Sequence, residues 1–143
     1  LGVVRANEEQ SFVMADIPGL VPGAHKGVGL GTQFLRHIER TNLFIHLVDA
    51  SGSAGRDPYQ DYLDISTELV EYDRSKAGDV EYVPLATRSQ LVVLNKTDII
   101  GEEETLHLQA KFLKKGIETM TISAAARKGL RELVIEIGKR VLK

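Results

Sequence analysis

The residues best placed for chemistry are Asn95, Lys96 and Asp98, which follow a short apolar run in the stretch Val-Val-Leu-Asn-Lys-Thr-Asp at 92–98. The edge of guanine offers two adjacent donors, N1–H and the 2-amino group, and one carboxylate can accept both in a charge-assisted pair. Adenine lacks this pair of donors, so a buried Asp98 facing adenine would be left partly unsatisfied. The spacing therefore predicts a guanine-reading loop at the end of a buried strand.

The neighbouring side chains suit the same task. Lys96 can lay its methylene stem on one face of the base while its ammonium reaches water or phosphate. Asn95 carries a donor and an acceptor on one head, so it can bind neighbouring backbone or the purine N7. Thr97 completes the loop. The alternative interpretation is a plain polar turn, which commonly follows a strand.

Composition limits the classes of protein that are possible. The chain has 143 residues, enough for one domain with a sizeable core, and its net charge of −2 argues against a global basic field for nucleic acid. It contains no cysteine, which excludes disulfides and thiolate metal sites. No apolar run is long enough for a membrane helix, so we expect a cytoplasmic protein without a membrane partner.

Apolar periodicity predicts the elements that position the loop. Strands are expected over 1–6, 11–15, 43–50, 90–94 and 119–123, and helices over a short segment from Thr32, over 57–72, 102–115 and 128–142. The first two strands resemble a hairpin. The alternation predicts an α/β fold, a doubly wound and mostly parallel sheet with an antiparallel edge strand and helices on both faces.

Two segments, 43–50 and 73–89, carry signals of their own. The strand at 43–50 is continuously apolar, as in strands buried on both faces. Within it His46 is expected to be a core or edge histidine, because no second His or Cys lies at metal spacing. Asp49 at its carboxyl end is a weak candidate for a ligand contact. Residues 73–89 lack periodicity and are expected to be an insert or a mobile segment.

In a doubly wound sheet the loops that follow the strands' carboxyl ends lie side by side. Three such loops carry unusual polar residues, namely 16–19, 95–98 and 123–125. The first, Asp-Ile-Pro-Gly, opens a segment with five glycines between positions 19 and 31, for which we expect a mobile loop. Each signal alone is weak or moderate, but their order and their places at strand ends make a strong combination.

These residues resemble the translation-factor-like GTPases. The stretch 16–31, Asp-Ile-Pro-Gly-Leu-Val-Pro-Gly-Ala-His-Lys-Gly-Val-Gly-Leu-Gly, resembles the Obg family more narrowly, and so does Phe-Leu-Arg-His-Ile-Glu-Arg at 34–40. The resemblance covers nearly the whole chain, with 73–89 its least diagnostic part. It implies a P-loop NTPase-like GTPase domain over 1–143 whose third, fourth and fifth motifs are 16–19, 95–98 and 123–125.

The resemblance also implies roles for individual residues. Asp16 would hold Mg²⁺ through a water, which suits an ion that keeps its hydration shell. The Gly19 amide would donate to the γ-phosphate, and its contact would be lost when that phosphate leaves. The implied γ-phosphate and switch residues are Asp16, Ile17, Pro18 and Gly19. The implied guanine-binding residues are Asn95, Lys96, Thr97, Asp98, Ser123, Ala124 and Ala125, with the Ala124 amide facing O6 and Ser123 bracing Asp98.

No residue is identified as catalytic. Leu20 stands where Ras-like enzymes place a water-orienting Gln, so hydrolysis is expected to be slow or to depend on another group or partner. His25 in the same segment is a weaker candidate for a general base.

The pattern Gly-x-x-x-x-Gly-Lys-Ser/Thr does not occur in these 143 residues, and neither does the second GTPase motif. Since residues 1–4 resemble the family's strand after that motif, we expect the chain to begin inside the GTPase domain and to be inactive alone. For the intact monomer the resemblance implies a GTP/GDP switch in ribosome assembly or stress control, with the large ribosomal subunit or rRNA as partner. The alternatives are an interaction module without phosphate chemistry and an unrelated flavodoxin-like protein.

Overall fold

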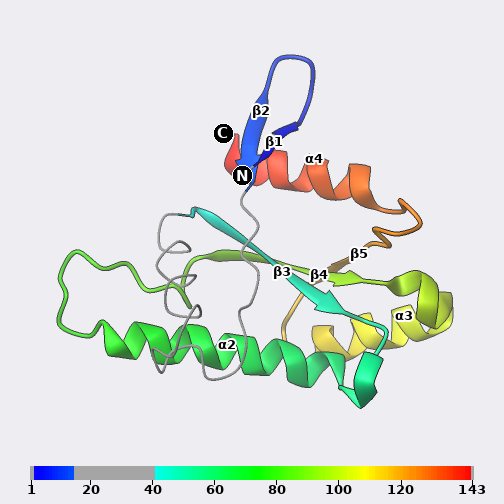
Figure 1. Cartoon of the computed structure of the whole chain (residues 1–143), viewed down its shortest axis with the longest axis horizontal. Coiled ribbons are helices and arrows are strands. Elements are labelled where there is room, and N and C mark those ends of the chain that lie inside the picture. The colour runs from blue at the N-terminus through cyan, green and yellow to red at the C-terminus, as the bar shows by residue number, and fades with distance from the viewer. Residues whose placement is uncertain (1, 15–40, 143) are drawn as a thin grey trace.

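A computed structural model of the chain describes residues 2–14 and 41–142 (Figure 1). The elements in order are β1 (Gly2–Arg5), β2 (Ser11–Met14), β3 (Leu43–Asp49), the 3₁₀ turn η2 (Ser53–Gly55), α2 (Pro58–Ser75), β4 (Ser89–Asn95), α3 (Thr97–Lys114), β5 (Thr119–Thr121) and α4 (Leu130–Val141). This alternation confirms the predicted α/β class. The helix expected from Thr32 and the glycine-rich segment lie outside the described residues.

Strands β3, β4 and β5 form a parallel sheet in that order, with Asp49 paired to Asn95 at its carboxyl edge. Strands β1 and β2 form the expected antiparallel hairpin. Within the described ranges this hairpin is a sheet of its own rather than the edge of the parallel sheet. It is held by side-chain packing instead of strand pairing, because Phe12 packs in the same cluster as Leu133 and Ile137 of α4.

Helices cover both faces of the parallel sheet, with α4 on one side and α2 and α3 on the other (Figure 1). Strand β4 supplies both cores because its side chains alternate between the faces. Leu91 and Val93 belong to the cluster with α4, whereas Val92 and Leu94 belong to the cluster around Phe112 of α3. The doubly wound arrangement is therefore confirmed, and β4 is its buried centre.

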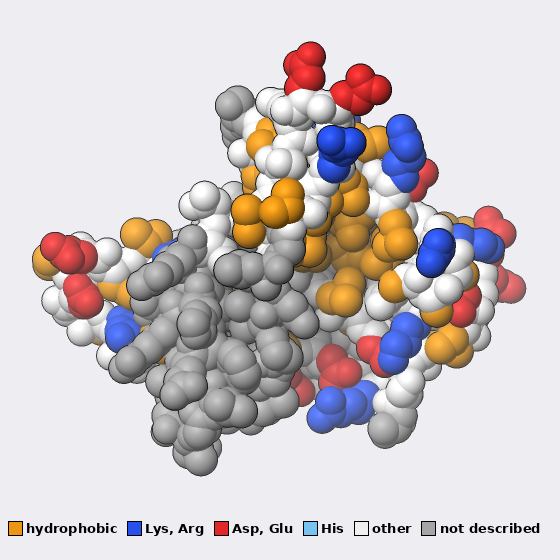
Figure 2. All heavy atoms as spheres, turned by 45° about the horizontal axis from the view of Figure 1, so that its top comes forward, with side chains coloured by type: hydrophobic (Ala, Val, Ile, Leu, Met, Phe, Trp, Pro, Cys, Tyr) orange, Lys and Arg blue, Asp and Glu red, His pale blue; other side chains and the backbone are white. Residues whose placement is uncertain are grey.

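The expectation that 43–50 is buried on both faces is wrong for β3. Leu43 and Ile45 pack against the cluster that includes α4, but Leu47 on the same face is 53% exposed. Among the described residues, the cluster that includes α4 covers only the first half of that face, and an apolar sequence does not reveal how far a covering helix reaches. Figure 2 shows hydrophobic side chains gathered in a hollow beneath the hairpin.

Residues 73–89, for which an insert or a mobile segment was expected, are held by side-chain hydrogen bonds to one acid. Helix α2 continues to Ser75, and the loop after it folds back onto Asp73. The Asp73 carboxylate accepts hydrogen bonds from the Tyr82 hydroxyl, the Leu85 amide at 2.6 Å and the Ala86 amide at 2.9 Å. Leu85 is completely buried. One acid thus anchors the loop, which the lack of periodicity could not indicate.

Local signals located the helix ends with different success. Helix α2 begins at the predicted place, where Asp57 caps it with Oδ2 accepting from the Gln60 amide at 3.2 Å. Helix α3 begins at Thr97, five positions before the expected start, but its backbone is non-helical at Gly101 (φ 82°). The predicted start at 102 therefore marks the second segment of a broken helix. None of the helices in the described part of the chain is long and apolar enough to cross a membrane.

Candidate functional site

Two of the three predicted loops come together at the carboxyl edge of the parallel sheet. Residues 95–98 connect β4 to α3, and 123–125 follow β5 beside them. Thr97 joins the two loops, because its hydroxyl donates to the Ile122 carbonyl at 2.9 Å and its amide to the same oxygen at 3.4 Å. The third loop, Asp16 to Gly19, lies outside the described residues.

The end of β4 turns sharply into α3 at Lys96, which adopts left-handed φ 64° and ψ 30°. A non-glycine residue in this region is uncommon and costs free energy that surrounding contacts must offset. Those contacts include the Thr97 bonds to Ile122 and the pairing of Asn95 with Asp49. The turn places the Asn95, Lys96 and Asp98 side chains at the sheet edge.

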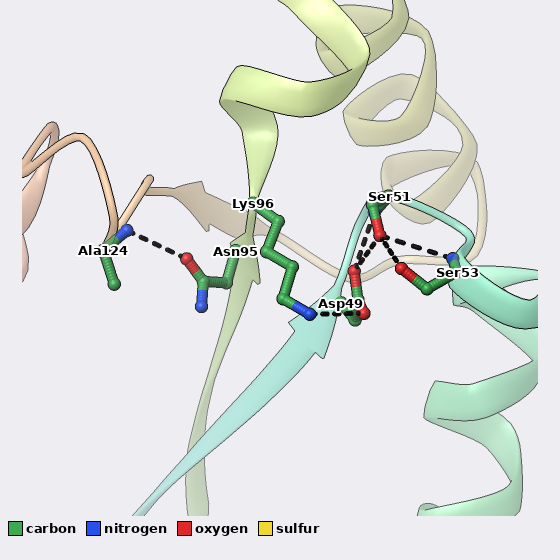
Figure 3. A network of polar contacts seen from close by, with 6 residues as sticks. All are labelled: Asp49, Ser51, Ser53, Asn95, Lys96 and Ala124. Atoms are coloured by element: carbon green, nitrogen blue, oxygen red, sulfur yellow. Dashed lines mark hydrogen bonds and ion pairs between the residues drawn. The ribbon is translucent and has the colours of Figure 1, made fainter.

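Asn95 ties the two loops together through its side chain. Its Oδ1 accepts from the Ala124 amide at 3.1 Å (Figure 3). This is the backbone contact anticipated for Asn95, but it engages the same Ala124 amide that the family resemblance assigns to the guanine O6. A base oxygen at this position would therefore share the donor with Asn95 or replace it.

Asp98 is braced by Ser123, as the resemblance implied. The Ser123 hydroxyl donates to Asp98 Oδ1 at 2.7 Å and accepts from the Ala126 amide at 3.2 Å. Ser123 is 1% exposed, so the surrounding protein holds its hydroxyl in place. Asp98, in contrast, is exposed at the surface. A buried hydroxyl thus orients an exposed carboxylate. Ala125 lies in the same turn, which the bridge between Ser123 and Lys128 closes.

Asp49 joins this group from β3. Its Oδ2 lies 3.0 Å from Lys96 Nζ, and its Oδ1 accepts from the Ser51 amide at 2.9 Å and the Ser51 hydroxyl at 2.6 Å (Figure 3). Burial raises the pKa of Asp49, but the bonds from Ser51 and the ion pair with Lys96 outweigh it and leave that pKa below its usual value. Sequence reasoning missed Ser51, although an Asp side chain commonly accepts a hydrogen bond from the backbone amide two residues further on.

His46 is a partly buried residue of β3, in line with the expectation of a core or edge histidine. Its ring centroid lies 4.9 Å from that of Tyr62, and its Nδ1 is buried without a hydrogen-bond partner. Burial lowers the pKa of His46 and outweighs the opposing effect of a side-chain hydrogen bond with Gln90, so the ring favours the neutral form. Within residues 2–14 and 41–142, no group of three His, Cys, Asp or Glu side chains could hold a metal ion.

The parallel α/β sheet with Asn-Lys-x-Asp at its carboxyl edge has the arrangement expected of a domain of the GTPase class. Residues 1–96 match the family described as 50S ribosome-binding GTPase. The whole chain is 55% identical to "GTPase Obg" of Bdellovibrio bacteriovorus, and 99% of it is 46% identical to "GTPase Obg" of Bacillus cereus. It spans 42% and 31% of the lengths of these relatives. The chain belongs to the 50S ribosome-binding GTPases and, among them, to the Obg family.

Ser123→Ala tests the brace on Asp98. In the full-length protein we expect GDP affinity to fall about tenfold, because a hydrogen bond to a charged acceptor contributes roughly 1.5–3 kcal/mol and water replaces part of it. Equilibrium titration with a fluorescent GDP analogue measures the effect. Ser75→Ala is the matched control, since it removes a serine bond to the Tyr72 carbonyl at the far end of α2. Equal affinities for all three proteins would contradict the bracing role.

Proposed function

We propose that this chain is the larger part of a GTPase domain that binds GTP and hydrolyses it slowly as a molecular switch. The observation that carries the proposal is the joining of the loops 95–98 and 123–125 at the sheet edge. The Ser123 hydroxyl lies 2.7 Å from Asp98 Oδ1, and Thr97 binds the Ile122 carbonyl. Two segments 25 residues apart thus form one site around the carboxylate that reads guanine.

The phosphate end of the site is proposed from the sequence and the family. Asp16 would hold Mg²⁺ through a water, and the segment from Asp16 to Gly19 would contact the γ-phosphate. The P-loop would come from residues that precede this chain in the full-length protein. The length of the Obg relatives supports this, and so do the exposed side chains of Val13 in β2 and Leu47 in β3, which offer apolar surface for a further segment.

The setting is also a proposal. The matched family is described as ribosome-binding, which supports the large ribosomal subunit or its rRNA as the partner of the intact protein. The chain itself carries a net charge of −2, so such a contact would not rest on a general basic field here. We propose a cytoplasmic monomer that acts in ribosome assembly or stress control.

Nucleotide binding by the full-length protein tests the proposed function. GDP and ADP are titrated separately with Mg²⁺ present, and phosphate release from GTP is followed over hours. We expect GDP to bind far more tightly than ADP, because adenine offers the Asp98 carboxylate no adjacent pair of hydrogen-bond donors. GTP should be hydrolysed slowly because Leu20 cannot orient water. The proposal fails if neither nucleotide binds, and an interaction module would then be the better interpretation.

A further inference from the structure

The two carboxylates at the sheet edge are used differently. Asp98 belongs to the guanine-reading motif, whereas Asp49 stands on the neighbouring strand and contacts a motif residue rather than belonging to the motif. The register that pairs Asp49 with Asn95 places the carboxylate of Asp49 beside Lys96, and the ammonium lies 3.0 Å from Asp49 Oδ2. In Figure 3 the Lys96 side chain runs from the end of β4 across to the end of β3.

The carboxylate of Asp49 is itself held in place. Both the amide and the hydroxyl of Ser51 donate to Oδ1, which leaves Oδ2 directed at Lys96. The Ser51 hydroxyl is within 2.6 Å of the Ser53 hydroxyl. The backbone is fixed as well, because the Ala50 amide donates to the Asn95 carbonyl at 2.9 Å. Asp49 is therefore an oriented anchor rather than a freely rotating surface acid.

We propose that Asp49 is a positioning residue for guanine-nucleotide binding, holding the Lys96 ammonium so that the methylene stem is extended beside Asn95 where a base can pack on it. The inference rests on the proposed function. A free lysine side chain loses substantial rotamer entropy when a ligand orders it. With the ammonium tethered before binding, that cost is largely removed from the binding step.

The ion pair also decides between two uses of Lys96. Its ammonium could contact phosphate, or its stem could cover the base. Engagement with Asp49 commits the ammonium to the protein and leaves the stem as the ligand-facing part. The substitution Asp49→Asn should therefore lower the affinities for GDP and GTP by the same factor. If Lys96 served phosphate, releasing its ammonium would instead strengthen GTP binding.

The pair contributes little to folding, which makes binding the better readout. The side chains of Lys96 and Asp49 are 48% and 35% exposed, and exposed ion pairs contribute little to stability. The pair of Arg140 and Glu136 on α4 matches it closely, with the same 3.0 Å separation and 39% and 33% exposure. Glu136→Gln is accordingly the matched control.

The experiment measures GDP and GTP affinity of the full-length protein with Asp49→Asn, Asp49→Glu, Glu136→Gln, Lys96→Met and the double variant Asp49→Asn/Lys96→Met. Thermal unfolding of each protein checks that it is folded. We expect Asp49→Asn to lower the affinities for GDP and GTP about fivefold. Asp49→Glu keeps the negative charge and should lower them less. Glu136→Gln should leave both affinities unchanged. In the Lys96→Met background, Asp49→Asn should have no further effect.

Several results would overturn the inference. If Asp49→Asn lowered nucleotide affinity as much in the Lys96→Met background as in the wild type, Asp49 would be shown to act independently of Lys96. Unchanged affinity for Asp49→Asn, or tighter GTP binding, would also exclude the positioning role while guanine binding by the wild type leaves the proposed function standing. A wild-type protein that binds no guanine nucleotide would overturn both.

Discussion

Asp98→Asn in the full-length protein is expected to reverse the preference between guanine and xanthine nucleotides. The amide presents a donor where the carboxylate only accepts, so it suits the carbonyl of xanthine and opposes the 2-amino group of guanine. We expect GDP affinity to fall by about 100-fold or more and xanthosine diphosphate to become the preferred ligand. Competition of the two diphosphates against a fluorescent analogue measures this preference.

The matched control for that variant is Glu103→Gln, which changes an exposed acid on the same helix α3. It should leave both affinities unchanged. Because Ser123 can still hydrogen-bond the amide oxygen at position 98, the variant should keep the loop in place and change only the pattern of donors and acceptors. If the Asp98→Asn variant still preferred GDP, the guanine-reading role of Asp98 would be contradicted.

Gly129→Ala is expected to destabilise the domain strongly. Gly129 precedes α4 with φ 77°, and an added Cβ would lie 2.5 Å from the Thr121 carbonyl and 3.1 Å from Ile122 Cγ2. Backbone strain and this clash together should lower the opening free energy of the sheet by about 2–5 kcal/mol. Hydrogen exchange of the β4 amides in the full-length protein measures that opening.

Gly116→Ala separates the two causes. Gly116 has nearly the same φ, 80°, but an added Cβ there would meet nothing within 4 Å. It should cost only the backbone strain, about 1–2 kcal/mol. Since Thr121 and Ile122 lead directly into Ser123, Gly129→Ala should also weaken GDP binding, whereas Gly116→Ala should not. Equal losses of stability in the two variants would exclude the clash as a cause.

Predictions from local pattern succeeded where the cause lies within a few residues of its effect. The start of α2 after Asp57 and the end of α3 at Lys114, shortly before Gly116, follow from short-range hydrogen bonding and backbone freedom. The alternation of strands and helices follows from periodicity, because each face of β4 needs an apolar cover. These signals were sufficient for the fold class and for placing Asn95 to Asp98 at a strand end.

The sequence by itself determined the class of fold and the residue types of the proposed guanine-reading loop, 95–98. Only the tertiary structure decided that Asp49 completes that loop through Lys96, whereas the bracing of Asp98 by Ser123 was already implied by the family resemblance. Lys96 contacts Asp49, which is 47 residues away in the sequence, and Asp98 contacts Ser123, which is 25 residues away. Such contacts depend on the register of neighbouring parallel strands, which no local pattern encodes. The same reason explains why the anchoring of 73–89 by Asp73 and the exposure of Leu47 emerged only from the packed structure.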